Sequence, residues 1–227
     1  MNEKVFIACD TTNLKKIRKL IKETKTKKLK IGYKFGLEFV NSKKGRAFIS
    51  KLKNEILFVD LKLHDIPNTM RSAVISLKDI KINYLTVHIS AGLKALKEVK
   101  KVAGKIKIAG VTTLTSLDNN NLKEIGYNKS VKNLVIHQSK LARKANLDAL
   151  VCSAHEAIHV KKIFKKEIIT PGIRLNSKSD DQKRIMNPRK AIYEKKSDWL
   201  VIGRSITKGN IKKNLDNLIK HFNINAE

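Results

Sequence analysis

A strand and the start of a helix lie together in the stretch Phe58-Val59-Asp60-Leu61-Lys62-Leu63-His64-Asp65-Ile66-Pro67-Asn68-Thr69. Its first half belongs to an apolar run over residues 56–63, and Asn68 or Thr69 is suited to cap the helix that follows. Short runs of this kind alternate with longer amphipathic segments along the chain, which is typical of a parallel sheet wound with helices. We therefore predict an α/β fold.

The number of strand-like runs decides the architecture. Eight runs follow one another, each with a helical segment after it, from residues 13–24 to residues 211–221. The runs lie at residues 5–10, 30–35, 56–63, 84–89, 107–113, 149–153, 167–171 and 199–203. Eight strand–helix pairs in 227 residues predict a (β/α)8 barrel, or TIM barrel, that forms a single domain over residues 1–227.

The charge of the chain is strongly positive, at +29 from 49 Lys and Arg against 20 Asp and Glu. A basic cluster on one face would indicate nucleic-acid binding, because it releases the counterions of phosphates. The lysines are instead spread over nearly every predicted helix, and aromatic residues, which stack on bases, make up only 5%. We expect a solvated lysine-rich surface with no nucleic-acid role and at most mild steering of an anionic small substrate.

The apolar runs and the cysteines indicate the compartment. Asp10 interrupts the first apolar run, and no later run approaches the ~18 apolar residues of a membrane helix. Cys9 and Cys152 lie inside apolar strand-like runs, and two thiols make no disulfide framework in a chain of this length. We expect a cytoplasmic protein that has no membrane partner.

Polar side chains end several predicted strands, and the carboxyl ends of the strands carry the active sites of such barrels. Asp10 ends the first run and Lys34 lies near the end of the second. Because side chains alternate along a strand, Asp60 and Lys62 share one face and should point into the barrel mouth. Opposite charges ~4 Å apart attract by roughly 4 kcal/mol at an effective dielectric constant of 20, so a purely structural ion pair is an alternative to a catalytic one.

Further segments complete a pattern that covers nearly the whole chain. Asp60, Lys62 and Asp65 form the motif Asp-x-Lys-x-x-Asp, with Ile-Pro-Asn-Thr directly after it. The other segments are Gly110-Val111-Thr112-Thr113-Leu114-Thr115-Ser116, Thr170-Pro171-Gly172-Ile173-Arg174, Asp181-Gln182-Lys183-Arg184 and Val201-Ile202-Gly203-Arg204-Ser205-Ile206-Thr207. In this order they closely resemble the orotidine 5'-phosphate decarboxylase family, in its bacterial type.

The resemblance implies an activity and a catalytic group. The activity is the decarboxylation of orotidine 5'-monophosphate to UMP, the last step of de novo pyrimidine nucleotide synthesis, with no cofactor and no metal. A Lys-Asp-Lys-Asp array of Lys34, Asp60, Lys62 and Asp65 would carry it, with Lys62 as the proton donor to C6. The resemblance also implies a homodimer in which Asp65 and Thr69 reach into the partner subunit's site.

The same resemblance implies the substrate contacts. Asp10 would hold the ribose hydroxyls together with Lys34, and Thr115 would lie beside the pyrimidine. Arg174, Gln182, Gly203 and Arg204 would hold the phosphate, in agreement with the phosphate sites that barrels often build after strands seven and eight. Pro171 would be a further substrate contact. Residues 176–184 are expected to form a mobile loop that closes over the phosphate, although Asn176-Ser177-Lys178-Ser179-Asp180 replaces the small residues frequent there.

Three other functions are weighed against this one. His155-Glu156-Ala157-Ile158-His159 matches the zinc-protease pattern, but no convincing third ligand follows it. Magnesium-dependent sugar-phosphate decarboxylases and aldolases share the barrel and the Asp-x-Lys-x-x-Asp strand, but their metal site requires an acidic ligand at the position of Lys34. A basic nucleic-acid-binding protein is the non-enzymatic alternative.

Overall fold

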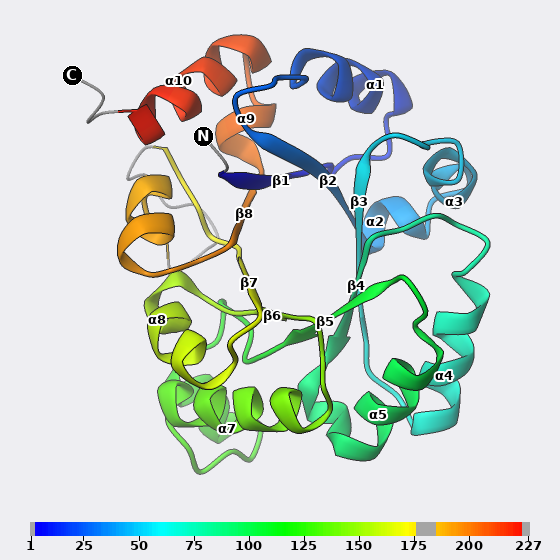
Figure 1. Ribbon diagram of the computed structural model, residues 1–227, viewed down its shortest axis with the longest axis vertical. Coiled ribbons are helices and arrows are strands. Elements are labelled where there is room, and N and C mark those ends of the chain that lie inside the picture. The colour runs from blue at the N-terminus through cyan, green and yellow to red at the C-terminus, as the bar shows by residue number, and fades with distance from the viewer. Residues whose placement is uncertain (1–2, 176–184, 224–227) are drawn as a thin grey trace.

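The chain forms a closed barrel of eight parallel strands in chain order, and the first strand pairs with the second and the eighth (Figure 1). The computed structural model describes residues 3–175 and 185–223. The strands are β1 Lys4–Ala8, β2 Lys30–Gly36, β3 Ile56–Leu63, β4 Tyr84–His88, β5 Lys107–Val111, β6 Ala149–Val151, β7 Glu167–Thr170 and β8 Trp199–Ile202. The predicted TIM barrel is confirmed.

Most strands end one or two residues before the predicted position. Several of the residues that were predicted to end them, Asp10, Thr113, Pro171 and Gly203, instead lie after the strands and line a cavity at the barrel mouth. These residues are therefore not paired in the sheet, and they contribute to the wall of the cavity instead.

Helices surround the barrel (Figure 1). They are α1 Leu14–Glu23, α2 Leu37–Val40, α3 Gly45–Ile49, α4 Pro67–Ser76, α5 Gly92–Val102, α6 Asn119–Glu124, α7 Val131–Lys144, α8 Ala154–Ile163, α9 Arg204–Thr207 and α10 Ile211–Asn223, with a 3-10 turn η1 Ile89–Ala91 and a π-helical segment η2 Lys190–Glu194. The predicted cap of α4 is wrong: the helix begins at Pro67, so Asn68 and Thr69 lie in its first turn. Proline is well suited to this position because it lacks the amide hydrogen that a first turn leaves unpaired.

The first helix shows why these segments fold as they do. The Asn13 side chain accepts a hydrogen bond from the amide of Lys16 at 3.1 Å and so caps α1. Ile17, Leu20 and Ile21 are buried, while lysines occupy the exposed face. The helix is therefore fixed by one apolar stripe against the barrel.

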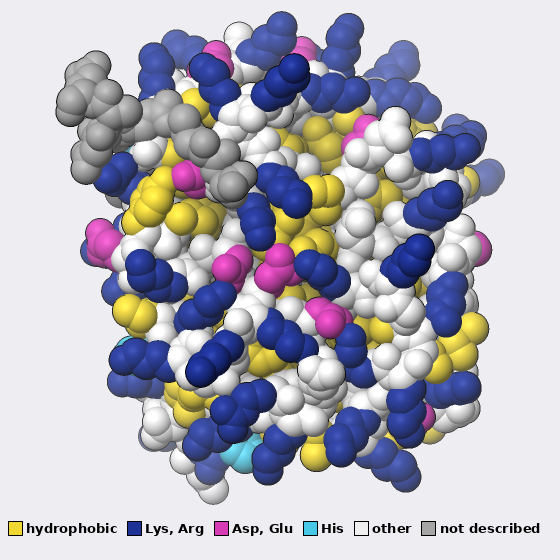
Figure 2. Space-filling view, in the orientation of Figure 1, with side chains coloured by type: hydrophobic (Ala, Val, Ile, Leu, Met, Phe, Trp, Pro, Cys, Tyr) yellow, Lys and Arg dark blue, Asp and Glu magenta, His cyan; other side chains and the backbone are white. Residues whose placement is uncertain are grey.

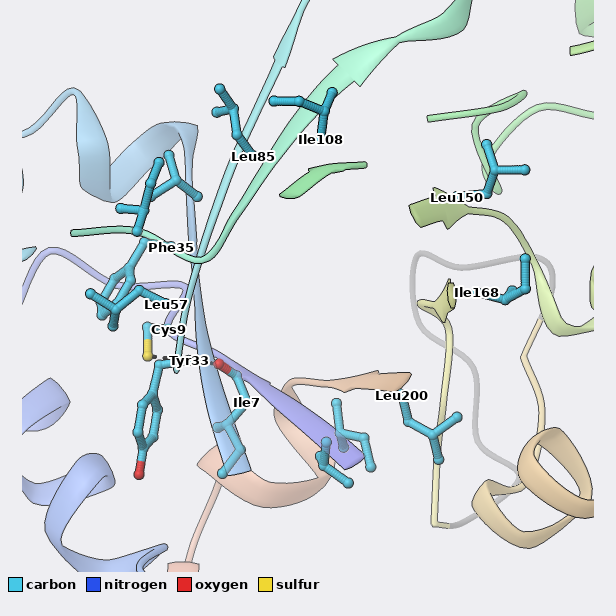
Figure 3. Packing of buried hydrophobic residues seen from close by; sticks show 14 of the residues in the cluster. Ile7, Cys9, Tyr33, Phe35, Leu57, Leu85, Ile108, Leu150, Ile168 and Leu200 are labelled. Atoms are coloured by element: carbon cyan, nitrogen blue, oxygen red, sulfur yellow. Dashed lines mark hydrogen bonds between the residues drawn. The ribbon is translucent and has the colours of Figure 1, made fainter. Parts of the chain in front are cut away.

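Alternation along the strands creates two separate apolar layers. One face of each strand points outward under the helices, with side chains such as Ile7, Leu57 and Leu200 (Figure 3). The other face fills the barrel interior with Phe6, Ala8, Phe58, Tyr84, Ala109, Ala149, Ile169, Trp199 and Val201. Full burial of a large apolar side chain contributes roughly 1.5–3 kcal/mol, so both layers stabilise the barrel.

The amino-terminal end of the interior is closed by aromatic rings and one carboxylate. Phe6 stacks on Trp199 with ring centroids 4.0 Å apart. Glu167 accepts hydrogen bonds from Tyr84 Oη at 2.8 Å, Lys107 Nζ at 2.9 Å and Trp199 Nε1 at 3.4 Å. This arrangement forms a floor below the cavity.

The third strand departs from regular pairing at the position that bears the predicted catalytic residues. From Val59 to Leu63, β3 advances four residues while its neighbour advances only two, from Leu85 to Val87. Within this irregularity Lys62 has φ of 50°, a left-handed conformation that is costly for a residue with a Cβ.

Lys and Arg side chains are spread over the whole of the face in Figure 2, with a few acidic side chains near its centre. This distribution agrees with the predicted solvated surface. Within the described ranges, no helix has both the length and the apolar character that a membrane crossing requires.

Candidate active site

A cavity of about 870 Å³ lies at the carboxyl ends of the strands, where barrels of this class place their active sites. Most of the predicted site residues line it. These are Asp10, Lys34, Asp60, Lys62, Thr115, Pro171, Arg174, Gly203 and Arg204. Residues from six different strands or the loops that follow them thus meet in one cavity.

Charges of opposite sign alternate along one wall of the cavity. Lys62 Nζ donates a hydrogen bond to Asp60 Oδ2 at 2.9 Å, and Lys34 Nζ lies 3.8 Å from the same oxygen. Lys34 Nζ also donates to Asp10 Oδ1 at 3.1 Å. The order Lys62, Asp60, Lys34, Asp10 gives each inner charge a neighbour of opposite sign on both sides.

Asp60 is the most enclosed carboxylate of this wall, with 13% of its side chain exposed. Burial acts to raise the pKa of Asp60. The ammonium groups of Lys34 and Lys62 and the hydrogen bonds from Lys62 and Thr86 lower it, and together they outweigh the effect of burial. The net pKa lies below its ordinary value, so the carboxylate is ionised at neutral pH. A permanent negative charge thus lies 2.9 Å from the Lys62 amine.

Two predicted catalytic or binding residues do not meet this wall within the chain. Asp65 is exposed, and its carboxylate accepts a hydrogen bond from the amide of Ile66 at 2.6 Å. Thr69 is exposed on α4. Neither lines the cavity as the described residues form it. The predicted role of Gln182 and the predicted mobility of residues 176–184 concern positions outside the described residues.

The predicted phosphate end is formed by the residues that follow β7 and β8. The backbone amide of Arg174 donates to Met186 O at 3.1 Å, which ties this loop to the segment before η2. Gly203 precedes α9, and a Cβ built on it would lie 3.6 Å from Ala8 Cβ and 3.8 Å from Asp10 Oδ2. These are ordinary contacts, and the half-buried Gly203 directly precedes Arg204 at the start of α9.

The loop after β5 carries Thr115 and is held from behind by a buried glutamine. Gln138 Oε1, on α7, accepts hydrogen bonds from Thr113 N at 2.9 Å and Thr113 Oγ1 at 3.3 Å. Gln138 is 6% exposed. This buried support fixes the start of the loop that reaches the cavity.

Two histidines lie next to the charged wall. The rings of His64 and His88 are 5.3 Å apart between centroids. Burial, the neighbouring His64 and the charge of Lys62 all lower the pKa of His88. His88 is therefore neutral at physiological pH.

One buried residue of the site was not predicted. Thr86, on β4, is fully buried and hydrogen-bonds to both Asp60 and the backbone of Lys62. Its signal in the sequence is a hydroxyl on the inward face of an otherwise apolar run. Threonine is common in strands for its shape alone, so that signal does not single it out.

The zinc-like motif lies on α8, with His155 and His159 exposed and Glu156 buried. Among the described residues, no group of three or more His, Cys, Asp or Glu side chains is arranged to hold a metal ion.

Known proteins resemble this chain over most of its length. Residues 3–214 match the family described as "Orotidine 5'-phosphate decarboxylase / HUMPS family". An orotidine 5'-phosphate decarboxylase of Wolbachia sp. subsp. Brugia malayi (strain TRS) is 42% identical over 222 residues, which cover 95% of this chain and 96% of the relative. One of Prochlorococcus marinus (strain MIT 9215) is 40% identical and covers 91% and 89% of the two chains.

A solved structure of the same family also has this fold. The crystal structure of orotidine 5'-phosphate decarboxylase from Lactobacillus acidophilus superposes with a TM-score of 0.83 at 28% identity, and covers 97% of this chain and 99% of that one. The predicted family is confirmed by its sequence profile, by relatives of nearly full length and by the structure. The chain belongs to the orotidine 5'-phosphate decarboxylase / HUMPS family.

Proposed function

We propose that the chain is an orotidine 5'-phosphate decarboxylase, a carboxy-lyase that converts orotidine 5'-monophosphate to UMP in pyrimidine nucleotide synthesis. The observation that supports this most strongly is the wall of alternating charges, in which Lys62 Nζ is 2.9 Å from Asp60 at the barrel mouth. Family membership supports the substrate.

The proposed chemistry depends on electrostatics. Loss of CO2 from C6 leaves a negative charge that the pyrimidine ring delocalises poorly, and the barrier reduction required lies toward the upper part of the roughly 8–23 kcal/mol that enzymes supply. The Lys62 ammonium, paired with Asp60, would stabilise the charge that develops at C6 and then donate its proton there. The Asp60 charge would at the same time repel the substrate carboxylate but not the product.

Binding energy from the phosphate would offset that repulsion. In the proposal Arg174, Arg204 and the backbone at Gly203 hold the phosphate, with Gln182 as a further contact. Thr115 lies beside the pyrimidine, Asp10 and Lys34 hold the ribose, and Pro171 is a further substrate contact. Energy gained far from C6 can in this way be used to keep the reacting carboxylate beside a like charge.

The position of Lys34 separates this function from that of the magnesium-dependent relatives. Its ammonium lies 3.1 Å from Asp10 and 3.8 Å from Asp60, so a cation of the protein itself occupies the space between the two carboxylates. A divalent ion there would have to displace that ammonium or share the space at a high electrostatic cost.

A homodimer with shared sites is part of the proposal. Asp65 and Thr69 are both exposed, and two large apolar side chains of the same region are exposed as well, Ile66 to 65% and Ile75, near the end of α4, to 41%. Exposed apolar side chains of this kind are available to pack against another chain. In the dimer, Asp65 of the partner subunit would flank Lys62 on the side opposite Asp60.

The decisive experiment follows the ultraviolet absorbance of orotidine 5'-monophosphate in the presence of a chelator. We expect rapid turnover by the wild type and a loss of more than about 10³-fold in kcat for Lys62→Ala, because the group that stabilises the transition state is removed. Lys100→Ala is the matched control, since Lys100 is also paired with an aspartate, Asp148 at 2.7 Å, but does not line the cavity. Turnover that needs magnesium, or that survives Lys62→Ala, would contradict the proposal.

A further inference from the structure

We propose that Thr86 is a positioning residue of this active site, whose hydroxyl fixes the Asp60 carboxylate and the Lys62 backbone at the same time. The inference rests on the proposed function in so far as Lys62 and Asp60 act in catalysis. Thr86 does not line the cavity among the described residues, so it would act through its two neighbours and not on the substrate.

The geometry of the hydroxyl is the first argument. Thr86 Oγ1 is 2.9 Å from Asp60 Oδ1 and 2.8 Å from the backbone nitrogen of Lys62, and the residue is 0% exposed. A backbone amide can only donate, so the hydroxyl oxygen accepts from Lys62. Its single proton is then donated to Asp60. Both bonds form together, and their directions are fixed.

The backbone of Lys62 is the second argument. Its φ of 50° lies in the left-handed region, within the irregular part of β3. A conformation of this kind costs on the order of 1–3 kcal/mol and persists only where its surroundings enforce it. In a regular sheet the amide would donate to a carbonyl of the next strand, but here it donates to the side chain of Thr86. The hydroxyl thus takes the place of a ladder bond where the strand is displaced.

The orientation of the carboxylate is the third argument. Thr86 binds Oδ1 of Asp60, while the ammonium groups of Lys62 and Lys34 lie 2.9 and 3.8 Å from Oδ2. Fixing one oxygen sets the rotation of the whole carboxylate, and with it the direction of Oδ2. One hydroxyl therefore fixes the backbone from which the Lys62 side chain extends, and it also fixes the Asp60 carboxylate that pairs with the Lys62 ammonium.

Three variants test this role. Thr86→Val keeps the branched shape and removes the hydroxyl, Thr86→Ser keeps the hydroxyl, and Thr170→Val removes a second fully buried strand hydroxyl, which bonds to Ser197 at 2.7 Å and not to the charged wall. We expect Thr86→Val to lower kcat by about 10²-fold with KM changed only a few-fold, because small displacements of a reacting group cost about this much. Thr86→Ser should retain most of the wild-type kcat, and Thr170→Val should match the wild type.

A substrate-free measurement separates a positioning role from a general loss of structure. The pKa of Asp60 can be followed by carbon NMR of labelled aspartate side chains, with Asp60→Asn to assign the signal. Lys34 and Lys62 face the same carboxylate and are unchanged in all variants, so loss of the hydrogen bond from Thr86 should raise the pKa of Asp60 in Thr86→Val alone. Thr86→Ser should restore the wild-type value.

The outcomes remain distinct from those of the decarboxylation test. If the wild type does not act on orotidine 5'-monophosphate, the proposed function fails, while the NMR titration still tests the hydrogen bond. A Thr86→Val variant with kcat within about 3-fold of wild type, or with an unchanged pKa of Asp60, overturns the inference. If Thr86→Val does not fold, Thr86→Ala replaces it, since alanine can form neither hydrogen bond, and wild-type kcat in that variant overturns the inference equally.

Discussion

Single residues of the charged wall differ in how visible they are in the sequence. Asp60 and Lys62 are predictable because charged side chains on the inward face of an apolar strand are costly unless they have a use. Thr86 is not predictable, because threonine satisfies the steric preferences of a strand whether or not its hydroxyl is used. Its role depends on which oxygen it faces, and that depends on an irregularity in the neighbouring strand.

His88 provides a pH-dependent prediction at the scale of one residue. Its pKa is lowered from the ordinary 6.5 by burial first, and then by His64 and Lys62. Between the folded and the unfolded pKa the unfolded chain binds more protons, so stability rises with pH in that window. The contribution of His88 is complete above about pH 6.5 and is lost as the pH falls below it.

The measurement is urea unfolding of the wild type and His88→Gln from about pH 5 to about pH 8. We expect the free energy of unfolding of the wild type to fall below pH 6.5 relative to the variant, with a slope of no more than about 1.4 kcal/mol per pH unit for one proton. His159→Gln is the control, because His159 is exposed. Parallel curves for wild type and His88→Gln would show that burial does not shift this group.

At the scale of elements, the eight strands were predictable but the displacement in β3 was not. Apolar runs of strand length and the helices between them fix the order and number of strands. The extra residues of β3 keep the same alternation of faces, so the hydrophobic pattern contains no trace of them. For the same reason the predicted pairing of Asp60 with Lys62 on one face holds, although the strand between them is irregular.

The left-handed conformation at Lys62 gives a prediction about stability. We expect Lys62→Gly to be more stable than Lys62→Ala by about 1 kcal/mol, because glycine adopts a positive φ without steric cost. Urea unfolding at neutral pH measures the difference. At Lys30, an exposed strand position, the order should reverse, because glycine weakens a regular strand. A Lys62→Gly variant less stable than Lys62→Ala would mean that φ at this position is relaxed.

At the scale of the whole molecule, the proposed dimer would complete the active site, because one chain alone does not bring all of the predicted site residues together. Lys34, Asp60 and Lys62 meet within the chain, whereas Asp65 and Thr69 face outward on exposed turns. The pattern of residues identifies these positions, but only the family resemblance assigns Asp65 and Thr69 to the partner subunit's site. That assignment depends on how two surfaces pack, which alternation and periodicity do not encode.

Complementation between inactive variants tests this arrangement. Lys62→Ala and Asp65→Ala should each be nearly inactive alone. When equal amounts are unfolded and refolded together, half of the dimers are mixed, and each mixed dimer holds one site with both intact residues. We therefore expect about a quarter of the wild-type activity per chain. No recovery in a mixture that contains mixed dimers would show that Asp65 acts in its own chain or not at all.

The aromatic floor of the barrel determines by which end small molecules can enter and leave the cavity. Phe6, Trp199 and their neighbours fill the axis below the cavity, and Glu167 with its four donors closes the far end. In the part of the chain that the structure describes, the pocket is therefore a dead end. In the proposed reaction carbon dioxide and the nucleotide therefore leave through the same opening, so the release of one product can delay the release of the other.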